Sequence, residues 1–119
     1  VMARRQRQMC IRDRIIDYFS SQGFDIVANT YLDIAADYDI GKVDQNFLLE
    51  TLSQIEIKNA DALFISCTAL PVLNIIERLE KKLGKPVITS NQSLIWDTLE
   101  SIGMNKNILG FGKLFNLDQ

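Results

Sequence analysis

One cysteine stands where an apolar run ends and a proline-opened helix is about to begin. Cys67 follows the apolar residues 62–66, and Pro71 comes four positions later. In parallel α/β folds, sites form beyond the carboxyl ends of the strands, where a helix N-terminus offers backbone N–H groups to an anion. Such a terminus also lowers the pKa of a thiol from its ordinary value of about 8.5. Cys67 is therefore a candidate acid, base or nucleophile, and a small buried hydrophobic residue is the alternative.

Four other residues are candidates for the same site. Thr68 and Ala69 open the segment after Cys67, and their N–H groups would point into the crevice. Ser90 and Asn91 end the next apolar stretch and could add hydroxyl, amide and backbone donors. Thr68, Ser90 and Asn91 are also residue types that cap helices, so a capping role and a substrate contact both remain open.

Several kinds of chemistry are excluded by residues that are missing. The chain has no histidine, so it cannot form a Ser-His-Asp or Cys-His nucleophile pair by itself. Leu70 and Leu73 occupy the positions that a C-x-x-C pair and a C-x5-R phosphate loop would need. The acidic loop contains Asp33, Asp37 and Asp39. Its carboxylates could hold Mg²⁺, but solvated charge on a loop is the favoured interpretation. The chemistry that remains possible is that of a thiol working without imidazole. Such a thiol could exchange a proton with carbon or add to an activated double bond.

The elements that must position these residues alternate between helices and strands. Apolar spacing predicts a helix that Gly23 ends, a helix that Asp44 caps, and a helix from Pro71 to Gly84. A last helix follows Ser90 or Asn91, with an apolar face of Leu94, Ile95, Leu99 and Ile102. Strands are predicted at residues 24–28, 62–66 and 86–89.

This alternation predicts an α/β fold, a three-layer sandwich with a parallel sheet, as in a flavodoxin-like lobe. The unbroken apolar run at residues 62–66 predicts a strand buried on both faces. Three strands are few for such a sheet, so we expect a further strand upstream of this sequence. No apolar stretch is long enough to cross a membrane. Two cysteines are too few for a disulfide framework, which favours a reducing, cytoplasmic location.

The charge divides the chain at residue 14. Residues 1–14 carry five arginines against one aspartate, whereas residues 15–119 carry eight basic against fourteen acidic side chains. Residues 4–14 resemble a translated transposase-type sequencing adapter over their whole length. We therefore predict a non-native segment at 1–14 and an incomplete carboxyl-terminal α/β lobe at 15–119. Cys10 is not considered a site residue, and a nucleic-acid-binding arm or an organelle presequence is not favoured.

Three stretches carry a family resemblance: "DALFISCTAL", "LEKKLGKPVITSNQSLIWDTL" and "GFGKL". They resemble the C-terminal half of the Asp/Glu racemase superfamily, in the branch of maleate cis-trans isomerases and arylmalonate decarboxylases. The resemblance covers residues 15–115 and implies two facing α/β lobes, each with a cysteine at a strand end. It implies that Cys67 is the second-lobe thiol, and that Thr68, Ala69, Ser90 and Asn91 line the pocket for the substrate carboxylate.

The implied activity is that of a cofactor-independent isomerase acting on a small dicarboxylate, without a metal. Arylmalonate decarboxylase-like and Asp/Glu racemase activities are the alternatives for the parent protein, and a non-catalytic flavodoxin-like binding module is a third. The first lobe, its cysteine and the Thr-Pro-Tyr segment of the family are absent from this sequence. We therefore expect the chain alone to be inactive. We expect no nucleic-acid or membrane partner, and a homo-oligomer stays open.

Overall fold

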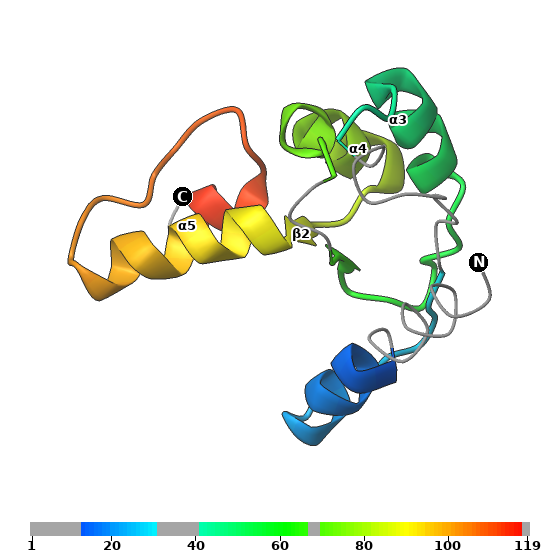
Figure 1. Cartoon of the computed structure of the whole chain (residues 1–119), viewed down its shortest axis with the longest axis horizontal. Coiled ribbons are helices and arrows are strands. Elements are labelled where there is room, and N and C mark those ends of the chain that lie inside the picture. Colours follow the sequence, from blue (N-terminus) through cyan, green and yellow to red (C-terminus); the bar gives the residue numbers. More distant parts are fainter. Residues whose placement is uncertain (1–12, 31–40, 67–69, 118–119) are drawn as a thin grey trace.

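Two short parallel strands form the sheet of the described structure. The computed structural model describes residues 13–30, 41–66 and 70–117. Strand β1 (Leu63–Ile65) pairs with β2 (Val87–Thr89), with Leu63 opposite Val87 and Ile65 opposite Thr89. Figure 1 shows β2 at the centre of the molecule, between the helices of the two sides. The parallel sheet predicted from the alternating pattern is confirmed for these two strands.

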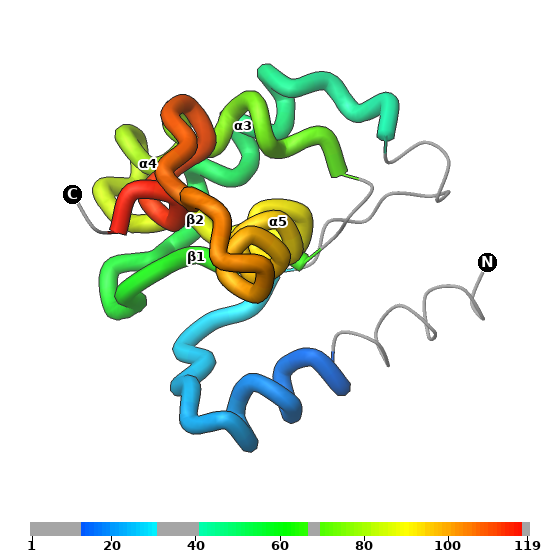
Figure 2. Tube along the Cα trace, turned by 90° about the vertical axis from the view of Figure 1, so that its left-hand side faces the viewer, coloured from blue at the N-terminus to red at the C-terminus, as the bar shows by residue number. Residues whose placement is uncertain are grey.

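Helices lie on both sides of this sheet, which gives the α/β lobe its three layers. Helix α3 (Gln45–Ser53), the 3₁₀ turn Leu73–Ile75 and α4 (Ile76–Leu83) cover one face. The helical residues 13–21 lie across the other face (Figure 2). Helix α5 (Ser90–Ser101) continues directly from β2 and projects to the side, and the chain returns along it to the 3₁₀ turn Lys113–Asn116 (Figure 1).

The core lies between the sheet and the pair α3 and α4. Leu48 of α3, Ile76 and Leu79 of α4, and Val87 of β2 are fully buried. The start of α3 and the end of α4 are as predicted, but the prediction that the second helix begins at Pro71 is wrong, because a 3₁₀ turn occupies Leu73–Ile75 and α4 begins at Ile76. Asp44 caps α3 by accepting a hydrogen bond from the N–H of Phe47 at 3.1 Å. Gly84 ends α4 in the left-handed conformation, with φ of 69°.

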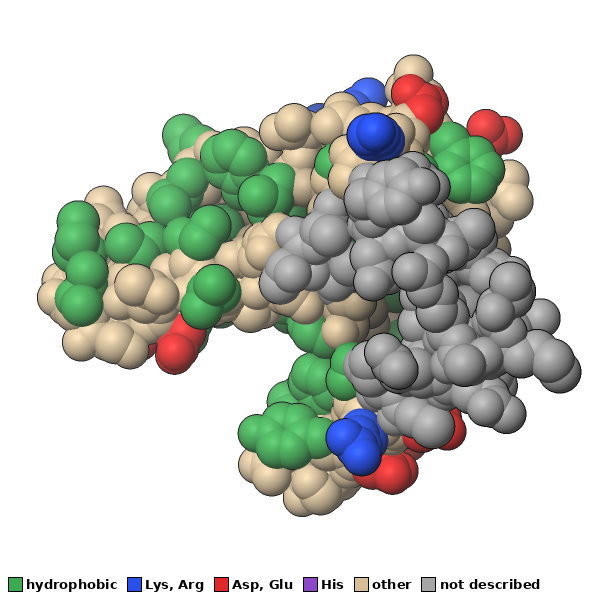
Figure 3. All heavy atoms as spheres, in the orientation of Figure 1, with side chains coloured by type: hydrophobic (Ala, Val, Ile, Leu, Met, Phe, Trp, Pro, Cys, Tyr) green, Lys and Arg blue, Asp and Glu red, His purple; other side chains and the backbone are tan. Residues whose placement is uncertain are grey.

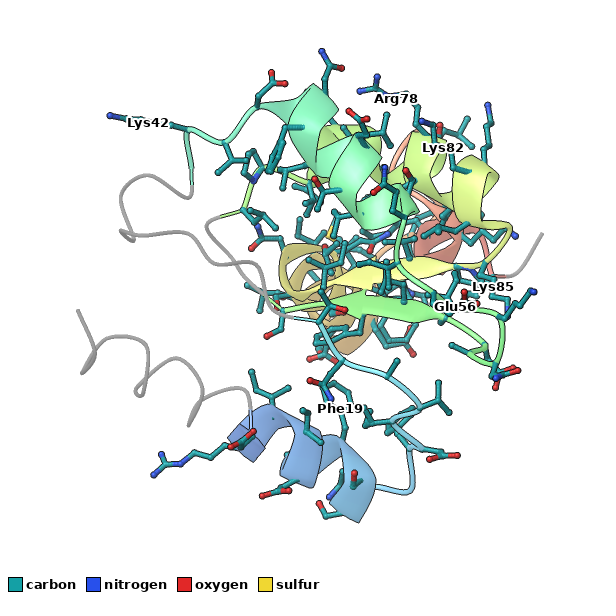
Figure 4. The ribbon with its side chains drawn as sticks, turned by 90° about the vertical axis from the view of Figure 1, so that its right-hand side faces the viewer. Phe19, Lys42, Glu56, Arg78, Lys82 and Lys85 are labelled. Carbon is teal, nitrogen blue, oxygen red and sulfur yellow. The ribbon has the colours of Figure 1, made fainter. Side chains whose placement is uncertain are left out.

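Lys85, in the short connection between α4 and β2, holds the turn before β1 in place. The Nζ of Lys85 donates to the carbonyl oxygens of Ile57 and Lys58 at 3.0 Å each, and also to that of Ala60 (Figure 4). The N–H of Leu63 then donates to the carbonyl oxygen of Pro86 at 3.0 Å. These bonds tie the starts of the two strands together and hold their register.

The prediction of a strand at residues 24–28 is wrong for this structure. Among the described residues, no strand or bridge is formed there, and no backbone hydrogen bond joins residues 25–30 to β1. A strand needs a neighbour to satisfy its N–H and C=O groups, and this segment has none in the described parts. Phe24 is 60% exposed, although its ring packs on that of Phe19 with centroids 5.5 Å apart.

The prediction that β1 is buried on both faces is also wrong. Ile65 faces the core and is buried, but Phe64 on the opposite face is 40% exposed. The only described ring that covers Phe64 is that of Phe19, from the helical residues 13–21, with centroids 4.9 Å apart. Figure 4 shows Phe19 pointing from this helix toward the sheet. One side chain covers less area than a packed helix face, so Phe64 keeps contact with solvent.

Within the ranges given above, no helix combines the length and apolar character needed to cross a membrane.

Candidate active site

The carboxyl ends of β1 and β2 bring two chain positions to the same edge of the sheet. Ile65 pairs with Thr89 in the parallel register, so the residues that follow them, Ser66 and Ser90, lie at the same edge. Ser66 is exposed and Ser90 is half-buried. Cys67, Thr68 and Ala69, which come next after Ser66, lie outside the described residues. Of the predicted site residues, the structure therefore describes Ser90 and Asn91.

Ser90 and Asn91 are the first two residues of α5, and both are half-buried. The prediction that one of them caps this helix is wrong, because Thr89 is the cap. Thr89 Oγ1 accepts from the N–H of Gln92 at 3.2 Å, and Gln92 Oε1 accepts from the N–H of Thr89 at 3.0 Å. Thr89 takes this role because it is the last extended residue, with φ of −119° and ψ of 162°. Neither Ser90 nor Asn91 is therefore the N-cap of α5.

Gln92 is the residue that the sequence analysis missed. It is fully buried, and its Nε2 also donates to the carbonyl oxygen of Phe111, nineteen residues further along the chain. The capping-box pattern, a threonine followed three residues later by a glutamine, is the signal that could have identified it. Gln92 fixes the start of α5 relative to both β2 and the C-terminal segment, and so it fixes where Ser90 and Asn91 lie.

A buried carboxylate holds the same junction from the other side. Glu80 of α4 is 7% exposed, and its Oε1 accepts from the N–H of Val87 and from that of Lys113, each at 3.1 Å. Gly112 lies between these groups with φ of 97°, and a Cβ there would come within 2.9 Å of Gln92 Nε2. This explains why a glycine stands at position 112, the second glycine of "GFGKL", because the backbone there closely approaches the buried side chains of Gln92 and Glu80.

The start of α5 is suited to an anion. The N-terminus of a helix carries a partial positive charge, and here it lies at the carboxyl edge of the sheet. The hydroxyl of Ser90 and the amide of Asn91 belong to that first turn. A small carboxylate is the ligand chemistry that such a set of donors fits. In the described residues, no group of three His, Cys, Asp or Glu side chains could hold a metal ion.

An open hollow of about 450 Å³ adjoins the end of β1 on the face away from the core. Its lining is mostly apolar and consists of Arg14, Ile15, Tyr18, Phe19, Phe64 and Ser66.

Comparison with known proteins relates the whole described lobe to one group of enzymes. The family model of arylmalonate decarboxylase matches residues 6–115. A maleate isomerase from Geobacillus stearothermophilus is 25% identical over 107 residues, which cover 89% of this chain and 43% of that protein. An arylmalonate decarboxylase from Bordetella bronchiseptica is 34% identical over 59 residues, which cover 49% of this chain and 25% of that protein.

Solved structures agree on the fold. A mutant of Nocardia farcinica maleate cis-trans isomerase with a covalently bound succinylcysteine intermediate superimposes with a TM-score of 0.82 at 23% identity, covering 93% of this chain and 46% of that one. A crystal structure of arylmalonate decarboxylase gives a TM-score of 0.80, covering 90% and 48%. The chain thus spans less than half the length of these relatives. Since the family model matches nearly the whole sequence, the chain belongs to the arylmalonate decarboxylase family.

Proposed function

We propose that this chain is part of a cofactor-independent isomerase that acts on a small dicarboxylate, with Cys67 as a thiol acid and base. The observation that supports this proposal is the parallel register of β1 and β2. It places the chain positions after both strands at one edge, beside the N-terminus of α5. The homologues are enzymes of isomerase and decarboxylase type, which agrees with a catalytic role for the parent protein.

In the proposed mechanism, the first turn of α5 holds a substrate carboxylate. Ser90 and Asn91 donate hydrogen bonds to its oxygens, and the helix dipole stabilises its charge. Thr68 and Ala69 would add backbone N–H donors from the segment after Cys67. The thiol of Cys67 gives a proton to one carbon of the double bond while a cysteine thiolate of the facing lobe adds to the other carbon, which leaves a single bond that can rotate. After rotation, Cys67 takes that proton back as the added thiolate leaves, so no net proton is consumed. Because the chain has no histidine, we assign this proton transfer to the thiol.

The comparison favours isomerisation among the reactions of this family. Maleate isomerases from three organisms match 87–91% of this chain. The succinylcysteine of the Nocardia farcinica enzyme shows that a cysteine of that protein bonds covalently to a four-carbon dicarboxylate unit. A thiol facing a dicarboxylate is therefore the chemistry that we propose for the parent protein here.

Decarboxylation is the second candidate, and a specific observation supports it. The Bordetella bronchiseptica arylmalonate decarboxylase has a higher identity, 34%, although over only 59 residues. In that reaction Cys67 would donate a proton to the carbon from which carbon dioxide has left. The carboxylate-binding role of Ser90 and Asn91 would be the same in both reactions.

The test is a chimaera in which residues 15–119 replace the matching part of the Geobacillus stearothermophilus maleate isomerase. We expect it to convert maleate into fumarate, and we expect Cys67→Ala to abolish turnover while Ser101→Ala, at the far end of α5, leaves it intact. Proton NMR distinguishes the two olefins directly. Full turnover by a folded Cys67→Ala chimaera would overturn the proposal. Release of carbon dioxide from phenylmalonate without isomerisation of maleate would establish the decarboxylase candidate instead.

A second measurement uses the chain as it is. The rate at which iodoacetamide alkylates Cys67 is followed against pH by mass spectrometry, with Cys10 as the internal reference. We expect the midpoint for Cys67 to lie below the ordinary thiol pKa of about 8.5, because a helix N-terminus favours the thiolate. Identical midpoints for the two cysteines would contradict the proposed environment of Cys67.

A further inference from the structure

Position 92 holds the neutral one of the two residue types that a capping box accepts. The box takes glutamate or glutamine there, because either side chain can accept the N–H of the cap residue. In this chain Gln92 Oε1 accepts from the N–H of Thr89 at 3.0 Å. A glutamate oxygen would accept the same bond, and its charge would suit the positive end of the helix. The cap of α5 therefore does not by itself require an amide.

The other end of the amide makes a bond that a carboxylate cannot make. Gln92 Nε2 donates to the carbonyl oxygen of Phe111, in the segment that returns along α5 (Figure 1). An ionised carboxylate has only acceptor atoms, so it would face that carbonyl oxygen without a proton between them. Gln92 is fully buried, so solvent does not replace a lost donor. One neutral side chain thus satisfies two backbone groups from separate parts of the chain.

A buried carboxyl group already lies beside this amide. A Cβ at Gly112 would lie 2.9 Å from Gln92 Nε2 and 3.1 Å from Glu80 Oε1, so both side chains lie against the same backbone atom. Glu80 is only 7% exposed. Of the elements that pack against α5, β2 has no titratable side chain, and the 3₁₀ turn Lys113–Asn116 has only Lys113, which is exposed. A carboxylate at position 92 would therefore be a second buried acidic group next to Glu80.

The charge at position 92 also acts on the turn that carries the candidate site. Ser90 and Asn91 come directly before Gln92 in the first turn of α5. The N-terminus of a helix is equivalent to about half a positive elementary charge. A carboxylate in the same turn brings a full negative charge, which is larger and of opposite sign. The amide leaves the turn positive, whereas a glutamate would make it negative.

We propose that Gln92 determines the charge of the ligand that the first turn of α5 accepts. Its neutral amide closes the cap and reaches Phe111 without placing a negative charge beside Ser90 and Asn91. Because Gln92 is fully buried, it acts through the turn rather than by contact with the ligand, and it is a positioning residue. This inference rests on the proposed function, in which that turn holds a substrate carboxylate.

The experiment compares sulfate binding by the full chain and by its Gln92→Glu variant. Sulfate is the probe because it keeps both negative charges from about pH 5 to about pH 8, a range above the ordinary glutamate pKa of about 4.3. Binding is followed by NMR through the ¹⁵N amide shifts of Ser90 and Asn91, with Ser101 at the far end of α5 as the reference. We expect the variant to bind sulfate at least about tenfold more weakly than the wild type near pH 8.

Acid should restore binding by the same variant. A protonated carboxyl group can accept from the N–H of Thr89 and donate to the carbonyl oxygen of Phe111, as the amide does. Burial and the neighbouring Glu80 both raise the pKa of the introduced carboxyl group. We therefore expect its affinity near pH 5 to return to within about threefold of the wild type at that pH. A loss of equal size at both pH values would refute the inference and leave the proposed function standing.

Gln92→Met is the matched neutral variant. It has a side chain of similar length and removes both hydrogen bonds without adding a charge. We expect it to weaken sulfate binding by the same factor at both pH values, and by less than Gln92→Glu near pH 8. If the two variants lose the same affinity near pH 8, the missing hydrogen bonds explain the effect and the charge does not, which contradicts the inference.

Two controls separate the remaining explanations. Wild-type chain that shows no sulfate-dependent shift at Ser90 and Asn91 would remove the proposed carboxylate site, and this inference with it, before any variant is made. Circular dichroism checks folding at each pH. If Gln92→Glu unfolds near pH 8, Ser93→Asp takes its place, because it puts a carboxylate on the next residue, which is half-buried. We expect that variant to bind sulfate about threefold more weakly, and unchanged affinity would count against the inference.

Discussion

Helices α4 and α5 follow one another along the chain but are held in place by different forces. Over its eight residues, α4 buries Ile76 and Leu79 completely and packs against α3. Over its twelve residues, α5 buries only Gln92. Its predicted apolar face is largely open to solvent, since Leu94 is 64% and Ile102 is 62% exposed. Figure 3 shows hydrophobic side chains gathered over α5 and the segment after it.

The difference in burial between α4 and α5 shows how this lobe positions its candidate site. Hydrophobic burial along its whole length fixes α4, whereas hydrogen bonds at one end fix α5. That end carries Thr89, Gln92 and the site residues Ser90 and Asn91. The first turn of α5 is thus held firmly while the rest of the helix contributes little to the core. Stability and site geometry should consequently respond to different substitutions.

The largest effect is expected from the core of α4. Leu79→Ala should lower the free energy of unfolding by about 2–5 kcal/mol, because it removes a fully buried side chain and leaves a cavity. Leu94→Ala on the exposed part of α5 is the matched control and should change it by less than about 0.5 kcal/mol. Urea-induced unfolding measures both. Equal losses would mean that α5 is buried in solution, for instance by another molecule.

The next effect is expected where the C-terminal segment meets both helices. Gly112→Ala would place a Cβ 2.6 Å from Ile76 Cγ2 and 2.9 Å from Gln92 Nε2. Gly110→Ala is the control, because its φ of 96° is nearly the same but a Cβ there meets no atom within 4 Å. The difference in unfolding free energy between the two variants should be about 1–3 kcal/mol, the usual cost of overpacking. No difference would show that the junction is looser than described.

A smaller effect is expected from the cap of α5. Thr89→Val keeps the shape of the side chain but removes the oxygen that accepts from Gln92, and should lower the unfolding free energy by about 0.5–2 kcal/mol. Thr89→Ser keeps the oxygen and should lose less. Circular dichroism and urea unfolding report the loss of helix and of stability together. If the valine variant is as stable as the wild type, the cap does not hold α5.

The smallest effect is expected at the exposed end of α5. Lys106 forms an ion pair with Glu100, and its Nζ lies 4.7 Å from the ring centroid of Trp96. Lys106→Met should change the unfolding free energy by no more than about 1 kcal/mol, and salt should diminish the difference. Lys82→Met, at an exposed position on α4, is the control for loss of a charge. A loss as large as that of Leu79→Ala would contradict the division between the two helices.

Much of the fold could be predicted because its signals are local. The cap at Asp44, the stop at Gly84 and the apolar runs of β1 and β2 each depend on a few neighbouring residues. The errors concern partners that are distant in the chain. The strand at residues 24–28 failed because no described neighbour pairs with it, and β1 was expected to be buried on both faces, although Phe64 is 40% exposed.

The candidate site shows the same division. The pattern of a strand followed by Ser90 and Asn91 at the start of a helix was predicted, and the structure describes that arrangement. The supporting residues Gln92 and Glu80 were not predicted, because their partners at Phe111 and Lys113 are nineteen and thirty-three residues away. Cys67, Thr68 and Ala69 stay predictions, and the chimaera described above tests the first of them.

The sequence by itself determined the order of α3, β1, α4, β2 and α5, the cap at Asp44, the stop at Gly84 and the family, since all of these depend on residue types at short spacing. Tertiary structure alone decided which edge of the sheet is closed and which faces of α5 and β1 meet solvent. The physical reason is that a backbone group or an apolar face is satisfied only by what lies against it. In this chain Glu80 and Gln92 close β2, whereas no described residue closes β1.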